Sequence, residues 1–365
     1  MTAPGAGASG EDALIARYFR PLATDAGAFG LVDDAAILKA SGEDALIARY
    51  FKPLATDPGA FGLVDDAAIL KASGEDIVVK TDAIVEGVHF LPDDPPDTIA
   101  RKALRVNLSD LAAKGATPAG FMLTLALRKA DDSWLAPFAR GLGEDAAHYG
   151  CPLLGGDTVS TPGPLMISIA AFGRVPSGKM VHRFGAQPGD RVVVTGTIGD
   201  ATLGLDILKG GKAAVALADN AAARDMLVAR YRVPQPRNAL APAIRDHASA
   251  SMDVSDGLAG DLAKLCAASG LSAVIDVPGI PLSAPAATLL ARGTADIGTL
   301  ISAGDDYEIL CAIPENRFEG FARAAGTAGV AVTSIGTIIA GILAPKFLDA
   351  QGREVPLPRL SYSHF

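Results

Sequence analysis

The sequence predicts an α/β (α+β) protein of two domains, on three observations. Its 365 residues, 49% of them apolar, exceed what one hydrophobic core usually holds. Short apolar runs of strand length alternate with segments of helical periodicity. A stretch rich in Pro and Gly, Gly173–Asp190, separates two such halves and is the best candidate for the domain junction.

The alternating patterns set the expected order of elements. We expect strands at Ile77–Thr81, Leu165–Phe172, Arg191–Thr195, Ser272–Val277, Ile309–Ile313 and Val330–Thr333. We expect helices at Asp97–Lys114, Ser133–Tyr149, Leu258–Ser269 and Arg317–Ala325. Asp97 is a plausible N-cap, and Gly150 and Gly270 stand where helix-ending left-handed residues belong.

The N-terminal part of the chain contains a tandem duplication. Ser9–Ala40 recurs as Ser41–Ala72, with changes only at Arg20/Lys52 and Ala26/Pro58. A helical solenoid needs three or more stacked units, so two copies do not predict one. The second copy reaches the next strand through about 6 residues and the first through about 38, which favours docking of the second by roughly 1.6 kcal/mol of closure entropy.

Composition narrows the expected partners and compartment. The formal net charge is -9 and no run of Lys or Arg occurs, so neither nucleic acid nor an anionic membrane is an expected partner. Cys151, Cys266 and Cys311 are far apart, which argues against a disulfide framework or a thiolate zinc site. The sequence has no basic, apolar leader and no apolar stretch of about 18 residues, so we expect a soluble cytoplasmic protein.

Carboxylates cluster at the ends of the apolar runs, beside Gly, Ser or Thr. Small neighbours let a ligand approach the backbone, and such carboxylates commonly hold Mg²⁺ that bridges to phosphate oxygens. Each one alone could instead be a turn former or a helix cap, so the interpretation depends on the set. Its members are Asp65, Asp66, Asp82, Asp110, Asp157, Asp253, Asp256, Asp305 and Asp306.

Met252–Gly257 is the sharpest of these signals. Alternation in an extended segment places Asp253 and Ser255 on one side, and Asp256 then leads into the expected helix. A helix N-terminus has free N–H groups that bind anions. The segment can hold a metal and its phosphate together, although an N-cap aspartate without a ligand would have the same sequence.

Two further segments give weaker signals. Asn107 and Asp110 share one face of an expected helix beside a buried leucine stripe, so Asp110 can face a cleft. Gly155 and Gly156 precede Asp157 and permit close approach of the backbone to a phosphate. The sequence has no Gly-x-x-x-x-Gly-Lys-Ser/Thr loop, no Gly-x-Ser-x-Gly elbow and no metal-ligand spacing of histidines, so a Ser–His hydrolase is not expected.

A site rich in carboxylates and poor in bases suits an acceptor that needs little deprotonation. If the nucleophile is a phosphate oxygen, the obstacle is repulsion between anions. Two dianionic groups about 4 Å apart repel by roughly 4 kcal/mol even in water. Metal ions remove that barrier, so positioning and charge neutralisation would carry the transfer of a phosphoryl group from ATP.

From about Ser41 to Phe365 the chain resembles the thiamine-monophosphate kinase family, whose superfamily also contains aminoimidazole-ribonucleotide synthetase and selenophosphate synthetase. The order and spacing of the motifs carry the resemblance. The motifs are Asp65-Asp66, Thr81-Asp82, Gly87–Phe90, Asn107–Asp110, Gly155–Asp157, Met252–Gly257, Gly304–Glu308 and Tyr362–Phe365. The resemblance implies phosphorylation of thiamine monophosphate to thiamine diphosphate by direct in-line transfer from ATP, with several Mg²⁺ ions.

The resemblance also implies roles for individual residues. Asp253, Asp256 and Asp110 would be catalytic through the metal that they hold. ATP contacts are implied at Gly156, Asp157, Arg183 and Ser255, and contacts to the thiamine end at His89, Asp305 and Tyr362. Mg²⁺ ligands are implied at Asp65, Thr81, Asp82, Asp110, Asp157, Asp253 and Asp256. Without the family, His89 could be a core histidine and Tyr362 ordinary packing.

The chain departs from the family pattern at several positions. Val64 replaces a usual Gly and Lys80 a usual Thr or Ser, while Asp305 stands for Glu and Tyr362 for Trp. The shorter Asp and the smaller Tyr weaken the substrate assignment more than the nucleotide one. The duplication is a further departure, and it adds a second possible ligand pair at Asp33-Asp34.

The family fold resembles that of aminoimidazole-ribonucleotide synthetase. It implies an N-terminal domain (41–184) that forms a homodimer through its sheet and a C-terminal α/β domain (185–365) that covers a cleft. Residues 1–40 would be an extra arm, either mobile or competing with the second copy, and deleting Ser9–Ala40 should leave kinase activity intact.

Two alternatives stay open: another ATP-using synthetase of the superfamily, and a non-catalytic nucleotide-binding regulator. Selenophosphate synthetase should carry a reactive Cys before Cys151, and a regulator should have lost some metal carboxylates.

Overall fold

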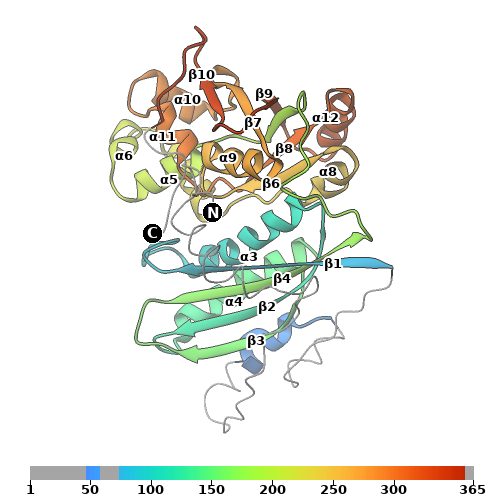
Figure 1. The fold of residues 1–365 in the computed structure, drawn as a ribbon. Coiled ribbons are helices and arrows are strands. Elements are labelled where there is room, and N and C mark those ends of the chain that lie inside the picture. The colour runs from blue at the N-terminus through green and yellow to red at the C-terminus, as the bar shows by residue number, and fades with distance from the viewer. Residues whose placement is uncertain (1–46, 58–73, 358–365) are drawn as a thin grey trace, which may run out of the picture.

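The computed structural model describes residues 47–57 and 74–357, which form two sheets with helices packed against them (Figure 1). The four-stranded sheet has the order β1-β4-β2-β3, and the six-stranded sheet has the order β10-β7-β9-β5-β8-β6. The expected mixed α/β class is confirmed. Figure 1 shows the four-stranded sheet below the six-stranded one, with α3 close to the junction.

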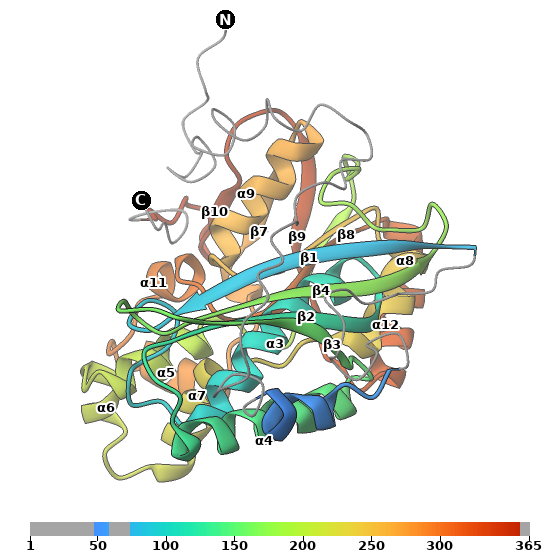
Figure 2. The ribbon, with the colours of Figure 1, turned by 90° about the horizontal axis from the view of Figure 1, so that it is seen from below.

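The N-terminal half consists of one sheet and two long helices on the same face of it (Figure 2). Strand β4 pairs antiparallel with both β1 and β2, while β2 and β3 run parallel. Its helices and strands are β1 (Glu75–Val85), α3 (Pro96–Ala113), β2 (Thr117–Leu127), α4 (Asp132–His148), β3 (Leu153–Ser160) and β4 (Met166–Pro176). They are preceded by a short π-helix, η3 (Ile47–Phe51), and a short 3₁₀ helix, η4 (Lys52–Leu54).

The C-terminal half is built on the mixed six-stranded sheet, in which β10 and β7 run parallel. Its strands are β5 (Arg191–Thr195), β6 (Ala250–Val254), β7 (Leu271–Asp276), β8 (Glu308–Ile313), β9 (Val332–Ala340) and β10 (Lys346–Leu348). Its helices are α5 (Asp200–Leu208), α6 (Lys212–Ala216), α7 (Ala221–Arg232), α8 (Ala241–His247), α9 (Leu258–Ser269), α10 (Ala284–Ala291), α11 (Ile297–Ser302) and α12 (Phe318–Thr327), with short turns η6 (Asn238–Leu240), η7 (Val277–Gly279) and η8 (Glu315–Arg317).

The four expected helices are all present, and their ends follow from local chemistry. Helix α3 starts at Pro96, one residue before the expected N-cap, because the fixed φ of proline suits the first helical position. The assignment of Asp97 as N-cap is therefore wrong, and this residue lies in the first turn. Gly150 and Gly270 have φ of 61° and 68°, which confirms the expected left-handed ends of α4 and α9.

Five of the expected strands match strands of the structure, and Val330–Thr333 does not. Strand β9 begins at Val332 and continues to Ala340, through Gly336, whose backbone is crowded by Val274 of β7. Strands β2 and β3 were not expected, because Pro118, Gly120 and the pair Gly155-Gly156 disfavour strand in isolation. Strand β4 runs to Pro176, so the connection to β5 is 177–190, shorter than the stretch expected from the sequence.

The two halves share buried apolar surface. Each half has its own core, and a third cluster joins Ala112, Ala113 and Val181 to side chains of the six-stranded sheet and of α8 and α12. Helix α3 also makes polar contacts across the junction: Arg105 donates to the Pro234 carbonyl at 3.0 Å, and Lys114 to the Ser251 carbonyl at 3.0 Å. Helix α3 is therefore packed between both halves.

Residues 47–57 belong to the second copy of the repeat and dock on the N-terminal half. Tyr50 and Phe51 are buried in its core, and Arg49 pairs with Asp132 of α4 at 2.6 Å. Figure 2 shows this short segment beside α4. The first copy, 9–40, and the pair Asp33-Asp34 lie outside the described residues.

The docking of the second copy predicts unequal effects of one substitution made in each copy. Phe51→Ala is expected to lower the free energy of unfolding by about 3–5 kcal/mol, because it opens a cavity in the core. The same change at the equivalent Phe19 should leave it within about 0.5 kcal/mol. Urea denaturation of both variants measures the difference. Equal losses would contradict a fixed preference for the second copy.

Two smaller observations bear on the class of protein. Cys151, Cys266 and Cys311 are each a buried free thiol. Among the helices of residues 47–57 and 74–357, none combines the length and apolar character that a membrane crossing needs.

Candidate active site

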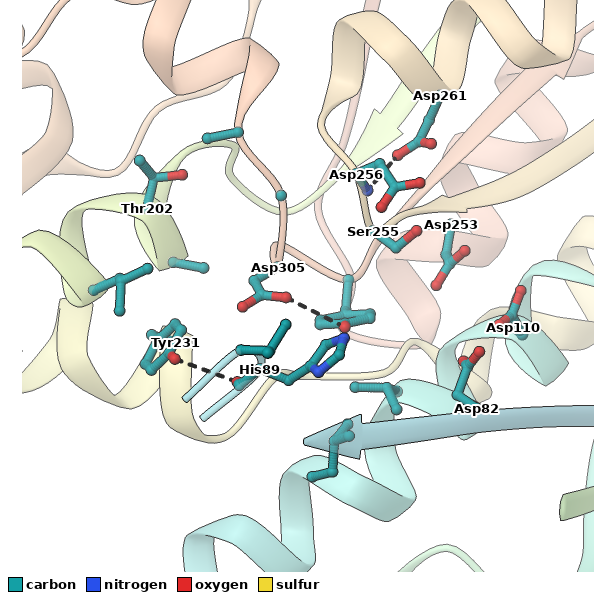
Figure 3. Close-up of a pocket in the computed structure, with 18 of the residues that line it drawn as sticks. Asp82, His89, Asp110, Thr202, Tyr231, Asp253, Ser255, Asp256, Asp261 and Asp305 are labelled. Carbon is teal, nitrogen blue, oxygen red and sulfur yellow. Dashed lines mark hydrogen bonds between the residues drawn. The ribbon is translucent and has the colours of Figure 1, made fainter. Parts of the chain in front are cut away.

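A cavity of ≈ 650 Å³ lies at the junction of the two halves. Strand β1, the loop that follows it and α3 line one side of the cavity. The other side is formed by α5, α7 and the loops after β6 and α11 (Figure 3). Of the residues proposed from the sequence, it gathers Asp82, His89, Asp110, Arg183, Asp253, Ser255, Asp256 and Asp305. Segments more than 200 residues apart in the chain thus meet in one space.

Asp82 and Asp110 lie together at one end of the cavity, with the ammonium group of Lys80 between them. Lys80 Nζ is 3.0 Å from Asp82 Oδ1 and 2.9 Å from Asp110 Oδ2. Lys80 and Asp82 point the same way because alternate residues of a strand share a face. Burial raises the pKa of Asp82 to about 6. The pKa of Lys80 is raised because the charges of Asp110 and Asp82 outweigh burial, so the lysine is a cation.

Asp253 faces this pair from β6 of the opposite half (Figure 3). Its side chain is almost fully buried, and burial together with the charge of Asp110 holds its pKa well above the ordinary value. The expectation that Asp253 and Ser255 face the same side is confirmed, since both line the cavity. A carboxylate held in this way is destabilising unless a cation or a proton accompanies it.

Asp256 follows at the turn into α9. Its backbone N–H donates to Asp261 Oδ2 at 2.9 Å, and its carboxylate contacts Lys264 Nζ at 2.5 Å. Asp261 is buried, which raises its pKa to about 7. Lys264 therefore neutralises the carboxylates of Asp256 and Asp261. Lys80 does the same for Asp82 and Asp110 at the other side of the cluster.

The opposite end of the cavity is formed around Asp305. Lys102, only 1% exposed, contacts Asp305 Oδ2 at 2.9 Å and donates to the carbonyl of His89 at 2.7 Å. The ring of Tyr231 lies 3.8 Å from the same ammonium group, and its hydroxyl donates to the His89 carbonyl at 3.3 Å. His89 lines the cavity and accepts from the Val85 N–H at Nδ1, so it is not a core histidine.

The two loops that carry Asp256 and Asp305 are joined through their backbones. The N–H of Asp305 donates to the Ser255 carbonyl, and the N–H of Tyr307 donates to Val254, both at 2.8 Å. Asp305 and Tyr307 have φ of 75° and 49°, a conformation that a bulky side chain rarely adopts. Gly304 is required here, because a Cβ would lie 2.2 Å from the Ser255 oxygen. The two loops are thus held together by backbone hydrogen bonds, with a strained backbone at Asp305 and Tyr307.

Several of the proposed residues lie elsewhere. Thr81 lies on the face of β1 opposite to Asp82, which is the face of the four-stranded sheet that α3 and α4 do not cover. Asp157 lies on the same face of that sheet, on β3 at its other edge. Gly156 lies against β2, where a Cβ would meet the Leu123 carbonyl at 1.8 Å, so strand packing alone requires a glycine there. Asp65 and Tyr362 lie outside the described residues. Thr81, Gly156 and Asp157 therefore do not line the cavity.

Sequence reasoning missed four side chains that shape the cavity: Lys102, Tyr231, Asp261 and Lys264. Lys102 gave a weak signal, as a cation among the apolar residues of α3. Tyr231 belongs to α7, a helix that the sequence patterns did not indicate. Lys264 and Asp261 are one turn apart on α9, a spacing that indicates an ion pair without placing it in a cavity.

The carboxylates fit Mg²⁺ by the chemistry of their donor atoms. Within residues 47–57 and 74–357, no three side chains of His, Cys, Asp or Glu form a ready-made metal site. Mg²⁺ is usually held by one or two carboxylates, with phosphate oxygens and water completing its octahedron. Asp82, Asp110, Asp253 and Asp256 could supply such ligands to an ion that enters with a nucleotide.

Asp306, next to the cavity, predicts a pH dependence of stability. It is buried and accepts from the Gly199 N–H at 2.8 Å, yet burial raises its pKa to about 8 from 3.8. Because the folded pKa is the higher one, its contribution to stability is complete below about pH 4 and is lost as the pH rises to about 8. Asp306→Asn keeps an acceptor for Gly199 and is expected to melt several degrees above the wild type at pH 9, but not at pH 4. Thermal melts across this range test it, and a constant difference would contradict it.

Comparisons with known proteins agree with this arrangement. Family models described as AIR synthase related protein, N-terminal domain and C-terminal domain, match residues 64–175 and 187–343. Thiamine-monophosphate kinase of Caulobacter vibrioides is 43% identical over 367 residues, covering 99% of this chain and 93% of the relative. The crystal structure of thiamine-monophosphate kinase from Stenotrophomonas maltophilia K279a matches with a TM-score of 0.73 at 34% identity, covering 86% of this chain and 96% of that chain. The structure of AaThiL complexed with AMPPCP and TMP matches with a TM-score of 0.69 at 28% identity, covering 91% and 100%.

Proposed function

Because the chain belongs to the thiamine-monophosphate kinase family, we propose that it transfers the γ-phosphoryl group of ATP to thiamine monophosphate, with Mg²⁺ neutralising the phosphates. The observation that carries the proposal is the two-ended cavity. Four carboxylates, Asp82, Asp110, Asp253 and Asp256, gather at one end, and Asp305 lies with Tyr231 at the other. One end suits metal-bound phosphates and the other a cationic ring.

The carboxylate end would bind and orient the two phosphate groups. Bound Mg²⁺ supplies the positive charge that lets two phosphate anions approach each other. Asp82 and Asp110 come from the N-terminal half, and Asp253 and Asp256 from the C-terminal half. Arg183, in the connection between β4 and β5, lines the same cavity as a further cation for the nucleotide phosphates. Ser255, in the loop before α9, could donate its hydroxyl to a phosphate, and the backbone N–H groups at the start of α9 also favour an anion.

The other end would bind the thiamine group. Asp305 can accept from an aminopyrimidine or offset the thiazolium charge, and Lys102 and Tyr307 hold its two carboxylate oxygens in place. The buried Tyr231 ring packs against Lys102 and supports this end of the cavity, and His89 closes its side. With the thiamine ring fixed here, its phosphate would extend toward Asp253, which aligns it for direct in-line attack on the γ-phosphorus of ATP.

The open face of the four-stranded sheet supports the proposal of a homodimer. Opposite the side covered by α3 and α4, it presents apolar side chains, with Val79 50% and Val159 43% exposed. A second copy of this chain would cover them, in an interface of the kind common to symmetric dimers. Thr81 and Asp157 lie on the same face, so we propose that their roles toward metal and ATP are exercised at this interface. For Gly156, Asp65 and Tyr362, the proposed roles rest on the family motifs.

The remaining proposals concern organisation. We propose that residues 1–40 form an arm, 41–184 the N-terminal domain and 185–365 the C-terminal domain. We also propose that the protein acts in the cytoplasm. The boundary at 184/185 falls within the connection 177–190 between β4 and β5.

A coupled assay for thiamine diphosphate tests the reaction. The purified chain is supplied with ATP and thiamine monophosphate, with and without Mg²⁺, and thiamine replaces the monophosphate in the control. We expect product from the monophosphate only, and only with Mg²⁺. Product without a divalent ion would refute the metal role, and binding of ATP without any product would favour the regulator.

A further inference from the structure

Lys80 stands where two carboxylates of the proposed metal site meet. Its ammonium group is 3.0 Å from Asp82 on its own strand and 2.9 Å from Asp110 on α3. Lys80 is the ion-pair partner of both carboxylates in the described part of the chain. Its side chain lines the cavity and is 32% exposed, so it is accessible to what the cavity binds.

An ammonium group and a divalent ion compete for the same lone pairs. The oxygens that contact Lys80, Asp82 Oδ1 and Asp110 Oδ2, are also ones through which these residues could bind Mg²⁺. A divalent ion bound to both oxygens would lie within a few ångströms of a positive charge that the protein itself holds. The two cations therefore exclude each other from this position.

The position of Lys80 on β1 directs its side chain at Asp82. Residues 80 and 82 lie on the same face of β1, so any side chain at 80 points at the carboxylate of Asp82. A short neutral residue here would leave Asp82 and Asp110 facing each other without a cation. Lysine fills that place permanently.

We propose that Lys80 is a resident cation of the site, which occupies a position between Asp82 and Asp110 that a divalent ion would otherwise take. The enzyme then binds one divalent ion fewer per protomer than a chain with a neutral residue at 80. The proposal rests on the proposed metal role of these carboxylates and adds that a side chain supplies part of the positive charge.

The test counts divalent ions in the full-length protein. Mn²⁺ serves as the probe, and free Mn²⁺ is followed by electron paramagnetic resonance during titration, in the presence of AMPPCP so that no turnover occurs. The variants are Lys80→Thr, which has a short hydroxyl side chain, and Lys80→Met, which keeps the length without charge. Lys129→Thr is the matched control, because Lys129 pairs with Asp131 at 2.9 Å but is exposed and outside the cavity.

Both variants at position 80 are expected to bind one more Mn²⁺ per protomer than the wild type and the control. In EDTA they should melt at a lower temperature, because Asp82 and Asp110 then repel each other, and excess Mg²⁺ should restore the melting temperature. An unchanged number of Mn²⁺ ions, with a melting temperature that Mg²⁺ does not restore, would overturn the proposal and make Lys80 a structural ion pair. Absence of Mn²⁺ binding in every variant would overturn the metal role of the site as well.

Discussion

Replacing Asp253 by Asn is expected to lower turnover by about a thousandfold or more, while leaving the fold intact. Asp253 faces Asp82 and Asp110 across the cavity and would supply the carboxylate of the C-terminal half to a metal bound at this end of the cavity. Asparagine has nearly the same shape but no charge, so it would weaken metal binding without opening a cavity. The assay for thiamine diphosphate measures the loss.

The same change should have the opposite effect on stability. Burial and the charge of Asp110 raise the pKa of Asp253, so its contribution to stability is complete below pH 3.8 and is lost as the pH rises. At pH 8 in EDTA, Asp253→Asn is therefore expected to melt above the wild type. Asp110→Asn should also abolish turnover. Asp296→Asn, a change at the exposed N-cap of α11, is the control and should retain activity. Wild-type turnover in both site variants would refute the assignment.

Lys102→Met is expected to lower the free energy of unfolding by about 1–3 kcal/mol, because the part-exposed Asp305 loses its cation and the His89 carbonyl loses a donor. It also removes the group that holds the His89 carbonyl and contacts the Tyr231 ring. The thiamine end of the cavity would lose its order, so the KM for thiamine monophosphate should rise at least about tenfold. Urea denaturation and steady-state kinetics measure the two effects.

A double-mutant cycle separates the ion pair from simple loss of packing. If Asp305 and Lys102 act together, Asp305→Asn in the Lys102→Met background should cost much less than Asp305→Asn alone. The KM for ATP should stay within about twofold in all variants, because the pair lies away from the carboxylate end. Lys129→Met is the exposed control. Additive free energies, or an equal rise in both KM values, would contradict a role confined to the thiamine end.

The sequence predicted the parts of the site that local patterns encode. Asp253 and Asp256 lie at or next to the end of β6 with small neighbours, and Asp110 shares a helix face with Asn107, so these signals are visible in a few residues. Asp82 was expected at a strand end but lies within β1, which continues to Val85. Lys102 and Tyr231 meet only because α3 and α7 pack across the junction, and no local pattern reports such a contact. Strand β3 was missed for a related reason: its two glycines are explained by the approach of β2, which the sequence does not display.

Helix α3 limits how the two halves can move. Lys102 and Arg105 of the helix, and Lys114 directly after its last residue, bond to the C-terminal half, and Asn238 of that half donates to the Leu108 carbonyl at 3.0 Å. The helix also covers the four-stranded sheet through its apolar face. Opening the molecule as a hinge would break these buried and part-buried bonds together. We therefore expect the cavity to keep a nearly constant width, because α3 ties its two sides together.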